Sequence, residues 1–337
     1  MKRCNAVVII PLLAVSAGLA QQASPYKLVN TVKVGGAGGF DYVYADVAGR
    51  RLYIPRPAAT GARISVFDLD SLAAVGEIPN ANARGVAVDP KSHHGFGSSK
   101  PVVMWDTRTL ATIKTIDVDG RPDGIMFDPF NDRVWVLSHQ APNATVIDAK
   151  DGSIAGTVDL GGEPEQAVSD GKGHIWIDIE DKDNIAAVDA KTLKVTAHYD
   201  LAGKGGGPGG LALDVKNHIL FSTCHEPATM VILNADDGKI IATLPIGKGT
   251  DGAGFNPKTM EAFSSQGDGT LTVVKENSPA SFEVEQNVPT KAGSRTMTID
   301  TKTDRIFSIT GDFTPPKPGE RRGQMLPDSF SIVVVGK

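Results

Sequence analysis

Residues 221–230 read FSTCHEPATM, which places a thiol, an imidazole and a carboxylate side by side at Cys224, His225 and Glu226. Such groups can bind a metal ion or form a nucleophilic site if the fold turns them toward one another. Successive residues near the end of a strand point to opposite faces, so adjacency in the sequence assembles neither site by itself. The chemistry of this stretch therefore depends on the elements that carry it.

A strand–turn–strand pattern occurs seven times along the chain after residue 20. Each turn opens with Asp or Asn, and these anchors are separated by 43, 39, 42, 44, 42 and 44 residues. The anchors are Asp46, Asp89, Asp128, Asp170, Asp214, Asn256 and Asp300. Asp and Asn favour tight turns because their side chains bond to the backbone two residues on, and propeller blades have a period of about 40–45 residues. The sequence predicts an all-β, seven-bladed propeller of four-stranded antiparallel blades.

The two ends of the repeat array indicate how the ring closes. A second turn recurs as VFDLDSL, MWDTRTL, VIDAKDG, AVDAKTL and ILNADDG, and the sixth copy, VVKENSP, departs from it at Lys275. The last blade ends on SFSIVVVGK, which supplies a third strand, whereas YKLVNTVKV near the start supplies a fourth. We expect these two strands to pair within one blade, because a closed ring leaves no open sheet edge.

The first twenty residues have the pattern of a secretory signal peptide. Lys2 and Arg3 precede an apolar stretch, and Gly18-Leu19-Ala20 offers small residues for cleavage after Ala20. We expect a periplasmic or secreted protein with a single propeller domain over residues 21–337. Cys224 would then be the only cysteine and no internal disulfide could form, so stability must come from the core. No later stretch approaches the ~20 apolar residues of a membrane span, and we expect a monomer.

The blade pattern resembles the YVTN-repeat propellers of the YncE-like family. The segment from Arg121-Pro122-Asp123-Gly124 to Asp148 carries the resemblance best, and PDSFSIVVVG near the C-terminus is also similar to the family. The resemblance covers the whole chain after the signal peptide and implies an exported bacterial propeller. Such propellers include metal-handling proteins, lactonase relatives and the heavy subunits of quinoprotein dehydrogenases, so the resemblance implies a fold rather than one activity.

The propeller topology predicts which charged residues share a face. With strands a to d counted outward, b–c loops and d–a connections emerge on one face, and a–b and c–d turns emerge on the other. The b–c loops bring Cys224, His139, Glu180, His225 and Glu226 to the first face. The d–a connections add candidate ligand-binding residues at the mouth of a funnel: Arg84, Arg121, Asp123, Glu165, Asp251 and Arg295. The a–b turns place His93, His94, His174 and His218 on the opposite face, where we expect them to be solvated.

A divalent metal ion, zinc or calcium, is the cofactor that the funnel residues could hold. His139, His225 and one carboxylate from Glu226 or Glu180 would suffice as ligands. Blade four separates the loops that carry the two histidines, and no H-x-H or C-x-x-C spacing holds ligands locally. The alternative is that Cys224 is a buried apolar residue at the end of a strand, with His225 and Glu226 as polar loop residues.

An insertion at residues 311–329 distinguishes the last blade. It contains Pro315, Pro316, Pro318, Pro327, Arg321 and Arg322. As a b–c loop it can extend over the funnel, where long ordered loops are often functional. The alternative is a strap that covers the blade in which the ring closes.

Three functions fit these observations. The leading hypothesis is a binding or scaffold module that takes a small ligand, a metal ion or a protein partner at the funnel, because the sequence contains no complete catalytic constellation. The alternative is a lactonase-like, metal-assisted hydrolase or lyase that uses His139, His225 and nearby carboxylates. Nucleic-acid binding ranks last, since the funnel loops are poor in aromatic residues and 39 acidic residues exceed 34 basic ones.

Overall fold

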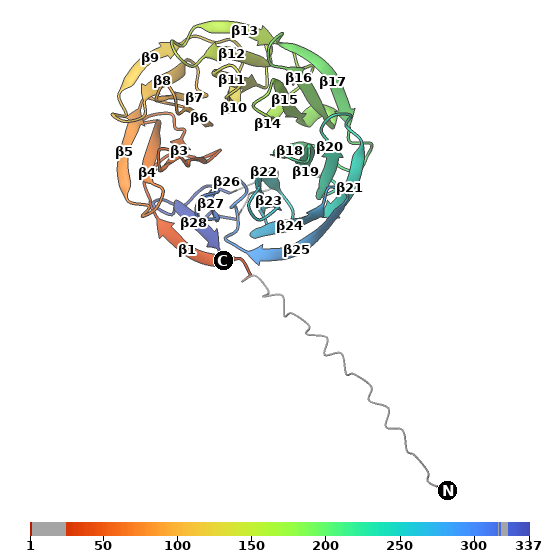
Figure 1. Ribbon diagram of the computed structural model, residues 1–337. Helices are drawn as coiled ribbons and strands as arrows, with labels where there is room; N and C mark the ends of the chain where they lie inside the picture. Colours follow the sequence, from red (N-terminus) through yellow and green to blue (C-terminus); the bar gives the residue numbers. More distant parts are fainter. Residues whose placement is uncertain (2–24, 316, 318–322) are drawn as a thin grey trace.

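The structure is a computed structural model that describes residue 1, residues 25–315, residue 317 and residues 323–337. Seven four-stranded antiparallel sheets stand in a ring (Figure 1), as the repeat spacing predicts. The proposed signal peptide lies outside the described residues, apart from Met1, and so do Arg321 and Arg322 of the insertion.

Within each blade the strands follow one another outward from the centre of the ring. The innermost strands, a, are β2 (Tyr44–Asp46), β6 (Val86–Asp89), β10 (Pro122–Asp128), β14 (Pro164–Ser169), β18 (Pro208–Asp214), β22 (Thr250–Asn256) and β26 (Met297–Asp300). The b strands are β3 (Arg51–Arg56), β7 (His94–Gly97), β11 (Arg133–Ser138), β15 (His174–Ile179), β19 (Ile219–Cys224), β23 (Glu261–Gln266) and β27 (Arg305–Thr310).

The two outer layers complete the blades. The c strands are β4 (Arg63–Asp68), β8 (Val102–Asp106), β12 (Ala144–Asp148), β16 (Asn184–Asp189), β20 (Thr229–Asn234), β24 (Thr270–Ser278) and β28 (Ser331–Gly336). The d strands are β5 (Ala74–Pro79), β9 (Thr112–Ile116), β13 (Ile154–Val158), β17 (Lys194–Asp200), β21 (Ile240–Pro245), β25 (Ser281–Pro289) and β1 (Lys27–Lys33). One 3-10 turn, η1 (Glu180–Lys182), is the only helical element in the described ranges, and none of their helices is long and apolar enough to cross a membrane.

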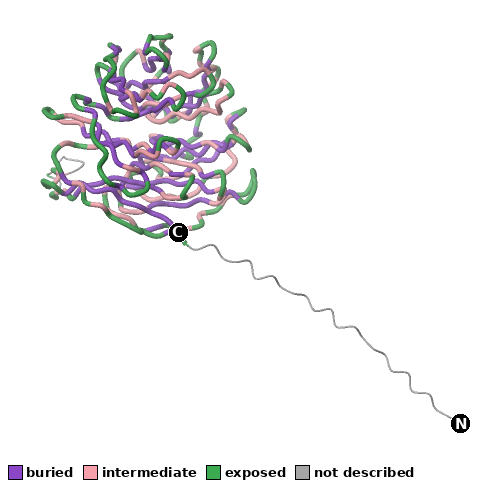
Figure 2. Tube along the Cα trace, turned by 60° about the vertical axis from the view of Figure 1, so that its left-hand side comes forward, coloured by how far each residue is buried: buried purple, intermediate pink, exposed green. Residues whose placement is uncertain are grey.

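The b and c strands form the core because both of their faces pack against neighbouring blades. They are buried almost throughout, whereas an outer strand such as β17 alternates between exposed and half-buried residues. Figure 2 shows this distribution, with buried chain inside the blades and exposed chain at the loops. Trp105, Trp135 and Trp176 lie in this core, as their apolar sequence surroundings predict.

The turn anchors work as the sequence predicts. Asp89, for example, accepts a hydrogen bond from the Lys91 backbone amide at 2.9 Å. The degenerate sixth copy behaves differently, because Lys275 does not anchor a turn but pairs with Glu283 in the ladder between β24 and β25. Both strands are nine residues long, so the hairpin extends beyond the usual turn position.

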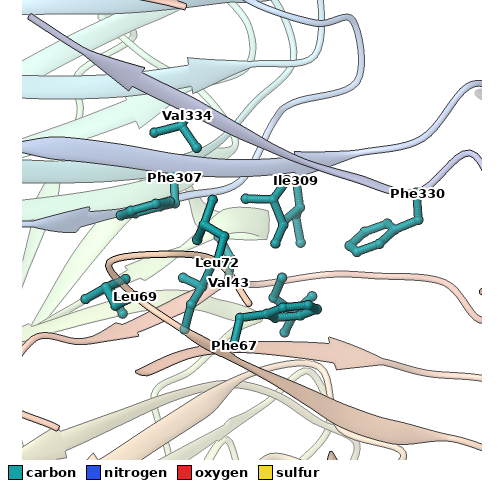
Figure 3. Packing of buried hydrophobic residues seen from close by; sticks show 12 residues of the cluster. Val43, Phe67, Leu69, Leu72, Phe307, Ile309, Phe330 and Val334 are labelled. Atoms are coloured by element: carbon teal, nitrogen blue, oxygen red, sulfur yellow. The ribbon is translucent and has the colours of Figure 1, made fainter. Parts of the chain in front are cut away.

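The ring closes in the way predicted from the two chain ends. Strand β1 pairs antiparallel with β28, so the last blade contains both terminal strands (Figure 1). Side chains from this blade and the first one interlock in a buried cluster that includes Val43, Phe67, Phe307 and Phe330 (Figure 3). This apolar packing joins the first and last repeats and removes the open edge.

Candidate functional site

The b–c loops and d–a connections enclose a cavity of about 1010 Å³, which we call the funnel. All the candidate ligand-binding and metal-binding residues except Cys224 line it, although their roles in binding stay predictions. These residues are Arg84, Arg121, Asp123, His139, Glu165, Glu180, His225, Glu226, Asp251 and Arg295. They share one face because alternate connections of a propeller emerge together, whatever the blade.

A ring of charged residues at the start of the a strands forms the mouth of the funnel. One position in each blade lies five residues before the turn anchor, and the repeat brings these positions around the centre. In blade order the ring is Asp41, Arg84, Asp123, Glu165, Gly209, Asp251 and Arg295. Sequence reasoning missed Asp41, and the constant offset from Asp46 is the signal that could have found it.

Arginines balance one part of this charge ring. Arg84 bonds to Asp41 at 2.7 Å and lies 3.8 Å from Asp123, and Arg295 lies 3.2 Å from Asp251. Burial, together with the neighbouring carboxylates, nevertheless raises the pKa of Asp123 to about 7 and that of Asp251 to about 8. Burial raises the pKa of Asp41 as well, against the opposing effect of both arginines. Eight carboxyl groups line the funnel against three guanidinium groups, so the arginines can pair with only part of them.

His139 lies between the two adjacent acidic residues of the ring. Its Nε2 atom is 3.1 Å from Oε1 of Glu165 and 3.3 Å from Oδ2 of Asp123. The interaction with Glu165 raises the pKa of His139, and Asp123 adds to this effect. Although burial would raise the pKa of Glu165, His139 and the Tyr42 hydroxyl, which donates to its Oε2 at 2.5 Å, lower it. Tyr42 was not identified from the sequence, where it reads as an ordinary strand residue.

The structure does not bring together His139 and His225, the two histidines that the sequence suggested as ligands of one metal ion. In the described part of the chain, the group with metal-ligand spacing is Asp123, His139 and Glu165, whose donor atoms lie within 4.8 Å of one another. His225 instead lies 3.7 Å from Glu180, so the two histidines do not converge on one point. The physical reason is blade four, which stands between their loops and inserts Glu165 beside His139.

His225 replaces the side chain that the charge ring lacks in blade five. A Cβ atom on Gly209 would lie 3.1 Å from Nε2 of His225, so the imidazole covers this position. Glu180 interacts in turn with Glu165, and burial together with that carboxylate raises the pKa of Glu180. His139 contacts Glu165 and His225 contacts Glu180, so the two histidines are joined by a pair of interacting carboxyl groups and not by one common metal position.

Comparisons with solved structures identify the fold. The WD40 repeats of RRP9 match with a TM-score of 0.72 and 11% identity, over 90% of this chain and 97% of that chain. U3-55K matches with a TM-score of 0.73 and 10% identity, over 92% and 99% of the two chains. A chain of the Mitotic Checkpoint Complex matches with 0.70 and 10% identity, over 90% and 95%.

The fold is a WD40-type propeller. At such low identity the likeness concerns the fold alone. No family model and no curated protein sequence matches the chain. Function must therefore be argued from the residues of the funnel.

Cys224 does not line the funnel of this WD40-type propeller. Its side chain is fully buried at the end of β19, and burial, with a contribution from Asp178, raises its pKa to about 12. His225 and Glu226 follow it into the funnel. Asp178 is also buried, 3.0 Å from the Ser222 hydroxyl, instead of facing the cavity. Cys224 is therefore a buried residue at the end of a strand, which is the alternative that the sequence left open.

Histidines of the a–b turns lie on the opposite face of the propeller and make local contacts. His174 Nδ1 is 2.7 Å from Asp170, and His218 Nδ1 is 2.8 Å from Asp236. Neither histidine lines the funnel. The histidines therefore lie on two different faces, as the propeller topology predicts.

The insertion at 311–329 packs against the segment that precedes β2. Phe313 forms a single β-bridge with Met325, and its ring meets Phe40 edge to face, with ring centroids 6.3 Å apart. Lys291 forms an ion pair with Asp312 at 2.8 Å. None of the described residues of the insertion lines the funnel. These contacts favour the interpretation as a strap over the closing blade.

Proposed function

We propose that this propeller is a binding module whose funnel takes a cationic ligand. The observation that carries the proposal is the charge of the cavity wall, which contains eight carboxylate side chains and three arginines. A polyamine, a metal ion or a basic side chain of a protein partner presents the required charge. An acidic cavity disfavours nucleic acid, in agreement with the sequence argument.

The excess negative charge is concentrated in blades three and four. Asp41 and Asp251 each have an arginine within 3.2 Å, whereas Asp123 and Glu165 follow one another in the ring without an arginine between them. Glu180 and Asp181 of blade four also line the same side of the funnel. We expect the positive group of the ligand to bind along this arc, where Coulomb attraction is strongest.

Raised carboxyl pKa values support the same conclusion. A pKa of about 7 for Asp123 and about 8 for Asp251 means that, near neutral pH, protons neutralise part of the crowded negative charge. A bound cation would take over this neutralising role and allow the carboxylates to ionise. Burial strengthens such pairing relative to an exposed site, because water screens the charges less.

A calorimetric titration tests the proposal, with spermidine as a cationic probe and citrate as an anionic one. We expect spermidine to bind and citrate not to bind. The double variant Glu180→Gln, Glu226→Gln removes two funnel charges and should weaken spermidine binding by up to about tenfold. The matched control is Asp151→Asn, Asp237→Asn, which removes two exposed charges from c–d turns on the opposite face. Citrate binding, or equal spermidine affinity in both double variants, would refute the proposal.

We further propose that the protein is exported and belongs with the YncE-like propellers. The signal-peptide pattern before Gln21 and the blade pattern around Arg121-Pro122-Asp123-Gly124 support this. Intact-mass measurement of the protein recovered from the periplasm or medium should show a chain that begins at Gln21. A full-length chain retained in the cytoplasm would contradict export without affecting the proposal for the funnel.

A further inference from the structure

We propose that Asp123, His139 and Glu165 form a binding site for one divalent first-row transition-metal ion, such as zinc. This inference rests on the proposed cation-binding function and narrows it to a metal ion at one point of the funnel. One imidazole nitrogen with two carboxylate oxygens suits zinc or manganese better than calcium, which prefers an all-oxygen shell. Three protein ligands leave at least one position open for water or ligand.

Two of the three donor-atom separations are those of ligands around one small ion, and all three atoms lie within 4.8 Å of one another. Bonds of about 2.0–2.1 Å to a common centre place neighbouring ligand atoms about 3.3–3.4 Å apart in a tetrahedral site and about 2.8–3.0 Å apart in an octahedral one. Nε2 of His139 lies 3.1 Å from Glu165 Oε1 and 3.3 Å from Asp123 Oδ2. Asp123 and Glu165 lie at the start of β10 and β14 in two adjacent blades, and His139 follows β11, so the ring scaffold fixes their separation.

The imidazole supplies a second observation that points to a ligand. The His139 side chain is only 9% exposed, and its buried Nε2 has no hydrogen bond of acceptable geometry to any residue that the structure describes. A buried polar atom without a partner is costly unless water or an ion satisfies it. This nitrogen lies 3.1 Å from an oxygen of Glu165 and 3.3 Å from an oxygen of Asp123.

On each carboxylate the inner oxygen faces His139, while the outer oxygen accepts a hydrogen bond in Glu165 and has only a longer ion-pair contact in Asp123. The Tyr42 hydroxyl bonds to Oε2 of Glu165 at 2.5 Å, while Oε1 faces the imidazole. Arg84 lies 3.8 Å from Oδ1 of Asp123, while Oδ2 faces the imidazole. Such outer contacts orient metal ligands in protein sites and strongly affect affinity.

Arg121 and Glu163 lie beside Nδ1 of His139 and favour different tautomers of its imidazole. A nitrogen of Arg121 lies 2.9 Å from Nδ1 of His139, and since a guanidinium can only donate, Nδ1 accepts and the ring proton stays on Nε2. Metal binding at Nε2 needs that proton on Nδ1. Oε2 of Glu163 lies 4.0 Å from Nδ1, beyond hydrogen-bond distance, and would have to move closer to accept a hydrogen bond from it. Arg121 therefore holds the imidazole in the metal-free tautomer, and Glu163 supports the metal-bound one.

Zinc titration of the full-length mature protein tests the site, with calorimetric affinity and zinc-edge anomalous scattering from crystals as readouts. We expect one zinc ion per chain, with the anomalous peak between His139 and Glu165. His139→Gln should lower zinc affinity at least 100-fold, and His174→Gln, on the opposite face, should leave it unchanged. Glu165→Gln is a second ligand variant in case His139→Gln unfolds, as judged by thermal melting.

Two positioning variants test the tautomer argument independently of ligand removal. Arg121→Gln should raise zinc affinity severalfold, because the competing hydrogen bond to Nδ1 is weakened. Glu163→Gln should lower zinc affinity about tenfold. A merely structural role of Arg121 predicts no increase, so unchanged or weaker binding in Arg121→Gln would refute this part.

Spermidine binding separates failure of the metal site from failure of the proposed function. Absence of zinc at the site, or equal zinc affinity in the wild type and His139→Gln, would overturn the metal site even if spermidine binds. Absence of spermidine binding to the wild type would instead overturn the proposed cation-binding function of the funnel.

Discussion

Buried aspartates at the two ends of the a strands differ in how well their carboxylates are paired. At the turn end, Asp300 is held by four hydrogen bonds, two from Arg50 and one each from the Lys302 amide and the Thr303 hydroxyl. At the funnel end, Asp251 lies beside Arg295 but also faces the field of Asp41, Glu165 and Asp123.

The pKa values express this difference. Although burial would raise the pKa of Asp300, hydrogen bonds from Arg50 and Thr303 lower it to about 2. Burial raises the pKa of Asp251 to about 8, and the one nearby arginine does not offset it. Asp300 thus stabilises the fold, whereas Asp251 costs stability and remains available to a ligand.

Asp300→Ala should have the largest effect, a loss of about 3 kcal/mol in the free energy of unfolding, because it leaves buried donors without their partner. Urea unfolding measures this loss. The stabilisation by Asp300 is fully present above its unfolded pKa of about 4 and is lost as the pH falls through about 2. The difference between the wild type and the variant should therefore shrink below about pH 3. A constant difference down to pH 2 would argue against the ion pair as the cause.

Asp251→Asn should act in the opposite direction and more weakly. The folded pKa of about 8 exceeds the unfolded value of about 4, so the contribution of Asp251 to stability falls as the pH rises between these values. The neutral amide removes this dependence. We expect the variant to be more stable than the wild type by on the order of 1 kcal/mol at pH 9, and nearly equal at pH 4. Asp300→Asn is the control, and a loss of stability in both variants would remove the contrast between the two ends.

Cys224 should show the smallest effect, namely no reaction in the native state. Its thiol is buried and its pKa is raised to about 12, so little thiolate exists at pH 8. A thiol reagent such as Ellman's reagent should label it only after denaturation. Labelling of the folded protein at the rate of a free thiol would place the sulfur in the funnel.

The sequence predicted the blades well because their signals are local. The anchors Asp46 to Asp300 recur with the blade period, and each closes a turn through nearby backbone amides. Lys275 was the visible exception, and there the hairpin extends beyond the usual turn. The topology of strands and loops then predicted which residues line the funnel, since a connection's place in the blade fixes its face.

The sequence by itself determined the seven repeats, the ring closure by β1 and β28, and the face on which each loop emerges, because alternation and turn chemistry act over a few residues. Only the tertiary structure decided that His139 meets Asp123 and Glu165 while His225 covers Gly209. The contact between His139 and Glu165 joins two blades, whereas the other two contacts join a loop to the innermost strand of the same blade, and their distances and burial depend on how the ring and the side chains are placed. Charged residues named from the sequence form a binding site only where the fold brings them together and buries them, because burial strengthens their interactions.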